Sequence, residues 1–125
     1  MKFTLDAGGS ANYIAAYRAG AVRIGEQEYQ HSLIVTPERL LQWTVSSSSE
    51  LTLAHLADAL QPQPDILVLG TGPRLEFPPL ALQAALSGQR IGLEIMDTAA
   101  ACRTYNVLLS ENRRVAAALI VSSAD

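Results

Sequence analysis

The apolar positions of this chain change their spacing a little over a third of the way along it. Up to Val45 they recur mainly at every second residue, which is typical of half-buried β-strands. From Leu51 onward, continuous apolar runs alternate with segments whose apolar positions recur every three to four residues. Such runs are typical of strands covered on both faces, and such segments of amphipathic helices. The pattern therefore predicts β-hairpins first and then an alternation of helix and strand.

The N-terminal part predicts short strands separated by turns. The strands are expected at Tyr13–Arg18, Val22–Ile24, Glu28–Thr36 and Leu41–Val45. Gly25-Glu26-Gln27 predicts a turn, and Pro37 separates the last two strands. The serine run 46–49 is expected to be a loop, since it is too short for a domain linker.

The remainder predicts three helices and three strands. The first helix is expected to be capped by Thr52 and ended by Pro62. Its buried face is expected to comprise Leu53, Leu56, Ala57 and Leu60. The second helix is expected to have Pro79 in its first turn and Gly88 at its end. The third helix is expected at Thr98–Ser110, and the strands at Ile66–Leu69, Ile91–Met96 and Val115–Val121.

Strand–helix–strand units require a right-handed crossover, so the last three strands are expected to be parallel and adjacent. The N-terminal hairpins are expected either to extend that sheet or to pack as a small second layer. The predicted fold is α/β, a single three-layer domain over residues 1–125. In it, β-hairpins precede an α-β-α-β-α-β order around a mostly parallel, mixed central sheet.

Composition narrows the classes of function. The chain has 125 residues, 49% hydrophobic and 17% charged, with a formal net charge of −3. The few basic residues are scattered, whereas nucleic-acid binders concentrate them, so DNA or RNA binding is not expected. A low proportion of charge is compatible with a protein-partner interface and also with an ordinary compact domain, and both interpretations stay open.

Cys102 is the only cysteine, which excludes an intrachain disulfide and a zinc–cysteine cluster. His31 and His55 lack the spacing of metal ligands, and no metal or cofactor is expected. No apolar run is long enough to cross a bilayer, and Met1–Asp6 carries neither a secretory signal nor a transit pattern. The expected location is the cytoplasm.

Candidate chemistry follows from the expected sheet, since open parallel sheets bind ligands beyond the carboxyl ends of their strands. One such end leads into the loop Gly70–Pro79. Leu75 occupies the place of the third glycine of a dinucleotide fingerprint, and no Walker-type Lys-Ser/Thr pair is present. The loop is interpreted as a sharp turn or as a small-molecule or anion cradle with Arg74 as its charge.

The other end leads into Asp97–Asn106, where Asp97 or Thr98 caps a helix. Free amides at that helix start would attract an anion, or Asp97 would itself occupy them. If the two loops converge, they form one concave binding surface. The predicted surface comprises Gly70, Thr71, Gly72, Arg74, Asp97, Thr98, Arg103 and Asn106. Cys102 lies on the apolar stripe of the helix and is expected to be buried and unreactive.

A family resemblance adds to this interpretation. The segments that carry it are Ile66–Gly72, Phe77-Pro78, Glu94–Leu108 and Arg113–Leu119. They resemble a small family of uncharacterised bacterial and archaeal proteins, whose eukaryotic relatives include a mitochondrial assembly factor for respiratory complex I. The resemblance implies a three-layered fold with a mixed sheet and an assembly role, and it brings no catalytic residues.

Two functional hypotheses follow. The first is a binding or assembly module that docks a protein partner through the surface formed by the two loops. The second is a small-molecule or anion-binding enzyme that uses the crevice at the ends of strands 66–69 and 91–96. The sequence does not favour an enzyme, since it contains no recognisable catalytic constellation. A flat, apolar, open patch would favour the first hypothesis, and a closed polar pocket the second. The sequence is compatible with a homo-oligomer.

Overall fold

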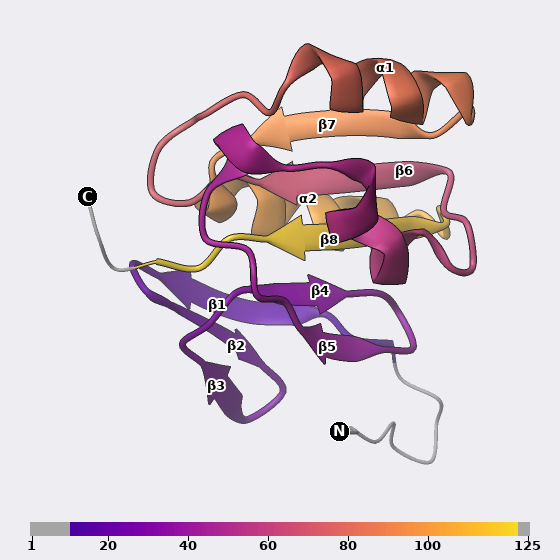
Figure 1. Cartoon of the computed structure of the whole chain (residues 1–125). Helices are drawn as coiled ribbons and strands as arrows, with labels where there is room; N and C mark the ends of the chain where they lie inside the picture. The colour runs from indigo at the N-terminus through magenta and orange to yellow at the C-terminus, as the bar shows by residue number, and fades with distance from the viewer. Residues whose placement is uncertain (1–10, 123–125) are drawn as a thin grey trace.

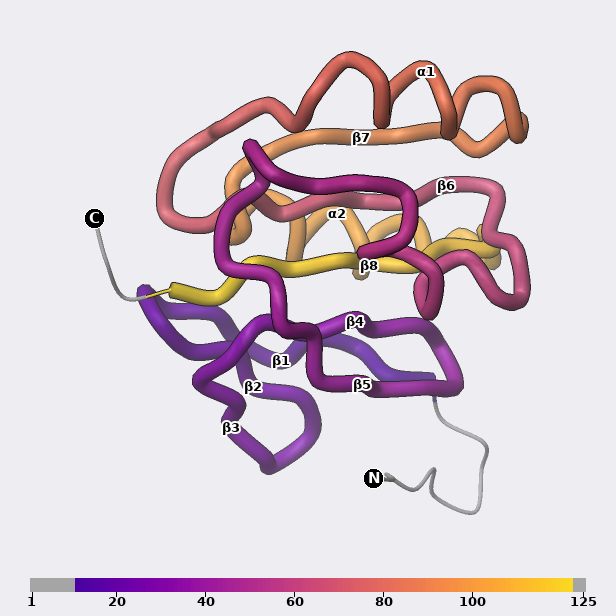
Figure 2. Tube along the Cα trace, in the orientation of Figure 1, coloured from indigo at the N-terminus to yellow at the C-terminus, as the bar shows by residue number. Residues whose placement is uncertain are grey.

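Residues 11–122 are described in a computed structural model of the chain. Within them, a small three-stranded sheet lies beside a larger five-stranded sheet (Figures 1 and 2). The small sheet comprises β1 (Ile14–Arg18), β2 (Ala21–Ile24) and β3 (Gln27–Tyr29). The large sheet comprises β4 (Leu33–Val35), β5 (Leu40–Gln42), β6 (Ile66–Gly70), β7 (Gly92–Met96) and β8 (Val115–Leu119). The helical segments are the 3-10 helices η1 (Ser48–Glu50) and η2 (Leu53–Leu60) and the α-helices α1 (Leu80–Gly88) and α2 (Thr98–Ser110).

The large sheet is mixed, with the strand order β5-β4-β8-β6-β7. β6 pairs in parallel with β7 on one side and with β8 on the other. β4 pairs antiparallel with β8, and β5 antiparallel with β4. The expectation that the three C-terminal strands are parallel and adjacent is therefore confirmed, with β6 in the middle.

Alternation along β6 and β8 separates two apolar cores. Leu67 and Leu69 belong to one buried cluster, and Val68 between them belongs to the other. The first cluster includes buried residues of η2 and α1, while the second includes those of α2 and of the small sheet. In Figure 1, α2 lies behind the large sheet. The sheet is thus covered on both faces, which confirms the predicted three-layer α/β fold.

The N-terminal strands do both things that the sequence left open. β1, β2 and β3 form the small second sheet, whereas β4 and β5 extend the large one. The single strand expected over Glu28–Thr36 is consequently wrong, because the chain changes sheet between β3 and β4. Ser32 lies at this crossing: its hydroxyl accepts from the Val121 amide at 3.0 Å and its carbonyl from the Trp43 amide at 2.9 Å. Apolar alternation continues across the crossing, so spacing alone did not reveal it.

The strand expected over Leu41–Val45 is shorter than predicted and begins one residue earlier. β5 ends at Gln42, and the chain turns away at Trp43. The indole N–H of Trp43 donates to the carbonyl of His55 at 2.7 Å, and the ring is buried in the core shared with η2. The Trp43 side chain thus fastens the end of β5 to η2, while its amide makes one further backbone bond to Ser32 beside β4.

The first predicted helix exists but is wound more tightly than an α-helix. η2 is a 3-10 helix, in which side chains three residues apart lie on the same side. Leu56 and Ala59 are buried, whereas Ala57 is exposed. The expectation that Ala57 faces the core is wrong, because it assumed a period of 3.6 residues where the chain adopts about 3.

Among residues 11–122, no helix combines the length and apolar character that crossing a bilayer requires. Met1–Asp6, on which the expectation about leader sequences depends, lies outside the described residues.

Gly70 marks the closest approach of α2 to the large sheet. A Cβ atom at Gly70 would lie 2.9 Å from Thr98 Oγ1 and 3.0 Å from Ala101 Cβ. Real Cβ atoms do not tolerate such distances, so the first turn of α2 can lie against the end of β6 only because residue 70 has no side chain.

Gly70→Ala is therefore expected to lower the free energy of unfolding by about 1–3 kcal/mol through overpacking. Gly88→Ala is the matched control, because a Cβ there meets nothing within 4 Å. The control is expected to be neutral or to stabilise by up to about 1 kcal/mol, since alanine favours helix. Urea unfolding of both variants measures the difference, and equal effects of the two substitutions would contradict the close approach.

Candidate functional site

The two predicted loops leave the same edge of the large sheet. Gly70 is paired with Met96 in the parallel register of β6 and β7, so Asp97 follows directly at that edge. The amide of Thr71 donates to the carbonyl of Met96 at 2.9 Å and continues the ladder beyond the strands. The expectation that Gly70 and Asp97 share one edge is confirmed.

The space between the loops is closed by hydrogen bonds of Thr98. Its buried hydroxyl donates to the carbonyl of Ile120 at 2.7 Å and accepts from the amide of Gly72 at 2.8 Å. The amide of Thr98 in turn donates to the carbonyl of Gly72 at 2.9 Å. Gly72 has φ +103, a conformation that glycine adopts without strain. We call this arrangement of Gly70, Gly72, Thr98 and Ile120 the threonine link.

Asp97 is the N-cap of α2. One oxygen of its carboxylate accepts from the amide of Ala100 at 2.9 Å. Together with the bond from the Thr98 amide to Gly72, this gives two amides of the first turn a protein partner. The role of Asp97 as a cap therefore accounts for its contacts. Fewer amides at the start of α2 are left free to bind an anion than the sequence analysis expected.

Arg103 and Asn106 line a separate hollow between α2 and β1, of about 220 Å³. The carboxamide of Asn106 pairs with both backbone groups of Ile14, accepting from its amide at 2.9 Å and donating to its carbonyl at 2.8 Å. Asn106 thus fastens α2 to the edge of β1. The Arg103 side chain is exposed at this hollow.

Thr71 and Arg74 line another hollow, of about 290 Å³, beside Ile120 and Ser122, which follow β8. The Thr71 hydroxyl donates to the carbonyl of Arg74 at 2.6 Å and accepts from the amide of Glu76 at 3.1 Å. These bonds fold the loop back on itself. The predicted residues thus fall into three groups, with the threonine link between a hollow that contains Arg74 and a hollow that contains Arg103.

The loop also carries a feature that the sequence analysis missed. Three large apolar side chains are exposed to solvent, with Leu75 53%, Phe77 61% and Leu80 79% exposed. We call Leu75, Phe77 and Leu80 the apolar ridge. Their sequence signal was the presence of large apolar residues among prolines in a segment without helix or strand periodicity. That signal does not distinguish a core contact from exposure.

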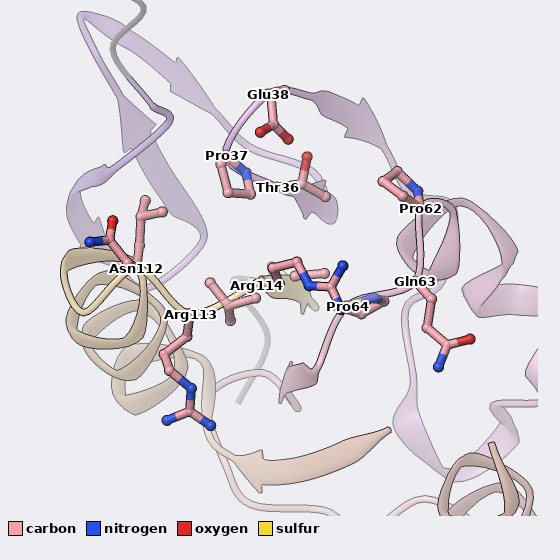
Figure 3. A pocket seen from close by; sticks show the side chains of 12 residues that line it. Thr36, Pro37, Glu38, Pro62, Gln63, Pro64, Asn112, Arg113 and Arg114 are labelled. Carbon is pink, nitrogen blue, oxygen red and sulfur yellow. The ribbon is translucent and has the colours of Figure 1, made fainter. Parts of the chain in front are cut away.

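A hollow of about 280 Å³ opens at the opposite edge of the sheet (Figure 3). Its walls include Pro37, Glu38, Pro62, Pro64, Arg113 and Arg114. The guanidinium of Arg114 lies 3.1 Å from the carboxylate of Asp65 in an exposed ion pair. Segments far apart in the sequence build this hollow, so no local motif could have indicated it.

Burial dominates the electrostatics beneath α2. It raises the pKa of the Cys102 thiol to about 12, and the nearby Arg103 guanidinium offsets only part of that increase. Burial also raises the pKa of Tyr105, with the Glu38 carboxylate adding to the effect. The Tyr105 hydroxyl donates to the carbonyl of Asn12 at 2.8 Å. Both groups are therefore held in their neutral, protonated forms. Among the described residues, no three His, Cys, Asp or Glu side chains come together as a metal site would require.

Asp97→Ala is expected to lower the free energy of unfolding by about 0.5–2 kcal/mol, because the Ala100 amide loses its cap. Thermal or urea unfolding measures this loss, with Asp97→Asn as the control that keeps a capping oxygen. If Asp97 acts only as a cap, partner binding stays unchanged in the alanine variant. Binding abolished with only this modest loss of stability would instead place Asp97 in the docking surface.

The raised thiol pKa predicts a loss of stability in alkaline solution. Below the pKa of the unfolded thiol, about 8.5, both states are protonated and the contribution of Cys102 is fully present. Above it the unfolded chain releases the proton while the folded chain retains it, so stability falls until the pH reaches the folded pKa of about 12. The expected slope is about 1.4 kcal/mol per pH unit for this group.

Urea unfolding between pH 8 and 11 measures that slope, and Cys102→Ala is expected to remove this group's share of it. The same burial predicts that a thiol reagent at neutral pH labels the native protein far more slowly than the unfolded chain. Equally fast labelling of both states would show that the thiol is accessible.

Comparison with known proteins places this geometry in a family. Residues 14–120 match the family described as "Protein of unknown function (DUF498/DUF598)". A Danio rerio protein named "NADH dehydrogenase (ubiquinone) 1 alpha subcomplex assembly factor 3" is 43% identical over 88 residues, which are 69% of this chain and 51% of that protein. The chain thus spans about half the length of that relative.

Bacterial relatives match over more of their length. A Francisella tularensis protein named "13 kDa major membrane protein" is 31% identical over 112 residues, which are 86% of this chain and 89% of that protein. An NMR structure of a Xanthomonas campestris protein superimposes with a TM-score of 0.84 at 39% identity, covering 100% of this chain and 96% of that one. These matches confirm the resemblance found in the sequence. The chain therefore belongs to the DUF498/DUF598 family.

Proposed function

We propose that this chain is a protein-docking module with an assembly-factor-like role, and that it docks its partner through the apolar ridge. The carrying observation is the exposure of Leu75, Phe77 and Leu80 around one loop. Single exposed apolar residues are ordinary on protein surfaces, but a group of large ones is typical of an interface.

The ridge is held in place from below by Glu76. Its amide donates to Thr71 at 3.1 Å, and its carbonyl accepts from the Ser48 hydroxyl at 2.6 Å. The same hydroxyl lies 3.1 Å from the Glu76 carboxylate. These bonds fix the backbone at residue 76, between the exposed side chains of Leu75 and Phe77. A loop fixed in advance loses less conformational entropy when a partner binds, which raises affinity.

The ridge makes a measurable contribution to the energy of a docked complex. Complete burial of an exposed Leu or Phe side chain contributes about 1.5–3 kcal/mol. Leu75 and Phe77 are already partly covered, so together they supply about 2–3 kcal/mol on docking. That corresponds to a factor of about 30 to 150 in the dissociation constant.

The names of the relatives suggest the class of partner. Several are named as assembly factors for NADH dehydrogenase, which supports an assembly-related role here. We assign as partner a protein subunit of a respiratory NADH dehydrogenase. The two are proposed to meet in the cytoplasm, which is the location that the sequence predicts. Of the predicted residues, Arg74 and Asp97 are then proposed as the polar rim of the docking surface, whereas Arg103 lies at the separate hollow between α2 and β1.

An open apolar ridge is the arrangement that favours docking over small-molecule chemistry. The alternative, an anion-binding enzyme at the crevice, depends on free amides at the start of α2. Thr98 and Ala100 direct theirs to Gly72 and Asp97 instead. These contacts therefore favour docking of a protein partner over anion binding.

The test replaces Leu75 and Phe77 together by serine in the full chain and returns the gene to cells from which it has been deleted. Assembled NADH dehydrogenase, measured on native gels by activity staining, is expected to fall well below the level restored by the wild type. The reason is the loss of about 2–3 kcal/mol of docking energy.

Val107→Ser is the matched control, since Val107 is 54% exposed but lies on α2, away from the ridge. It is expected to restore assembly fully. The proposal fails if the double variant, folded by circular dichroism, restores as much enzyme as the wild type does.

A further inference from the structure

Helix α1 has an uncharged surface, which is unusual for a helix at the outside of a protein. Its sequence, Leu80–Gly88, contains no Asp, Glu, Lys or Arg, and the preceding residues from Phe77 contain none either. Only Leu82 and Leu86 of this helix are buried. A helix that is solvated on its outer face normally carries charged residues there, so the composition of α1 is that of a helix covered on both sides.

The outward residues of α1 form a seam suited to another helix. Leu80, Ala84 and Ser87 recur at four- and three-residue spacing and are all exposed. Phe77 precedes Leu80 by three residues and continues the apolar surface into the loop. In Figures 1 and 2, α1 is the outermost element at the β7 end of the large sheet, so the described chain leaves this side open to an approaching molecule. From Leu80 to Ser87 the seam is about 10 Å long, since a helix rises about 1.5 Å per residue.

We propose that a second copy of this chain covers the seam, with the two α1 helices antiparallel about a twofold axis near Ala84. A partner helix here must itself be uncharged, because a charged side chain pressed against this surface would lose its water without gaining a partner. The α1 seam of a second copy meets that requirement, and an uncharged surface creates no like-charge repulsion against itself. Twofold pairing is also the commonest form of self-association.

Size complementarity supports the antiparallel arrangement. The seam is bulky at Leu80 and small at Ala84 and Ser87. Antiparallel pairing places Leu80 of each copy against the small end of the other helix, and the alanines at the centre allow the axes to approach closely. Parallel pairing would instead oppose the two bulky ends.

The inference rests on the proposed function, because Phe77 and Leu80 belong to the apolar ridge. The second copy covers the ridge while the assembly partner is absent, and the partner displaces it. Self-association is therefore expected to be weak, because the interface is small.

Sedimentation of the purified full chain tests the inference. The wild type is expected to approach twice its 13.4 kDa mass as its concentration rises. Leu80→Glu is expected to remain monomeric, because each glutamate would be pressed against the uncharged face of the other copy. Val107→Glu is the matched control, an exposed apolar residue changed in the same way elsewhere, and it is expected to dimerise like the wild type.

Disulfide cross-linking tests the position of the axis. The only native cysteine, Cys102, is buried, so a cysteine introduced at the surface reports without interference. Ala84→Cys is expected to form a covalent dimer under mild oxidation, since antiparallel helices bring the two positions within disulfide reach. Val107→Cys is expected to stay monomeric. Equal cross-linking of the two variants would overturn the arrangement.

A wild-type chain that stays monomeric at concentrations on the order of 1 mM overturns the inference. So does a monomer that binds phosphatidylglycerol vesicles through Leu80, which would make a lipid surface the occupant. The gene-restoration assay separates the two proposals. If the wild type is monomeric and the Leu75/Phe77 double variant fails to restore assembly, only the proposal of a second copy is contradicted. If Leu80→Glu abolishes the dimer and the double variant assembles the enzyme normally, only the proposed assembly role is contradicted.

Discussion

The hydroxyl of Thr98 joins three segments that meet at the carboxyl edge of the large sheet. By donating to Ile120 and accepting from Gly72, it fixes the start of α2 against the chain that leaves β6 and the chain that leaves β8. A buried hydroxyl with both roles satisfied holds its neighbours firmly, because breaking either bond would leave a buried backbone group without a partner. Gly70 makes this contact possible by leaving room for the threonine.

The threonine link also sets the position of the loop that follows Gly72. Thr71 and Ser48 hold Glu76, and the residues on either side of it are left in solvent. The position of the ridge therefore depends on Gly70 and on the hydroxyl groups of Thr71 and Ser48. The segments that carry the family resemblance include this edge, at Gly70–Gly72 and Asp97–Thr98.

Spacing and composition predicted the three layers, the parallel trio of strands and the shared edge of Gly70 and Asp97. They could not predict that Thr98 would close the space between the loops, because that depends on distances between segments more than 20 residues apart. The change of sheet before β4 was also not predicted, since apolar and polar residues alternate in the same way before and after it. The tighter winding of η2 was not predicted because Leu53, Leu56, Ala57 and Leu60 have the spacing of an α-helix.

The central claim is that the apolar ridge meets a subunit of NADH dehydrogenase, and site-specific photo-cross-linking in living cells tests it most directly. A photoreactive phenylalanine analogue is placed at position 77 and, for comparison, at the similarly exposed position 107. The account predicts a cross-link from position 77 to a subunit of the enzyme and none from position 107. Cross-links to that subunit from position 107 but not from position 77 would contradict it.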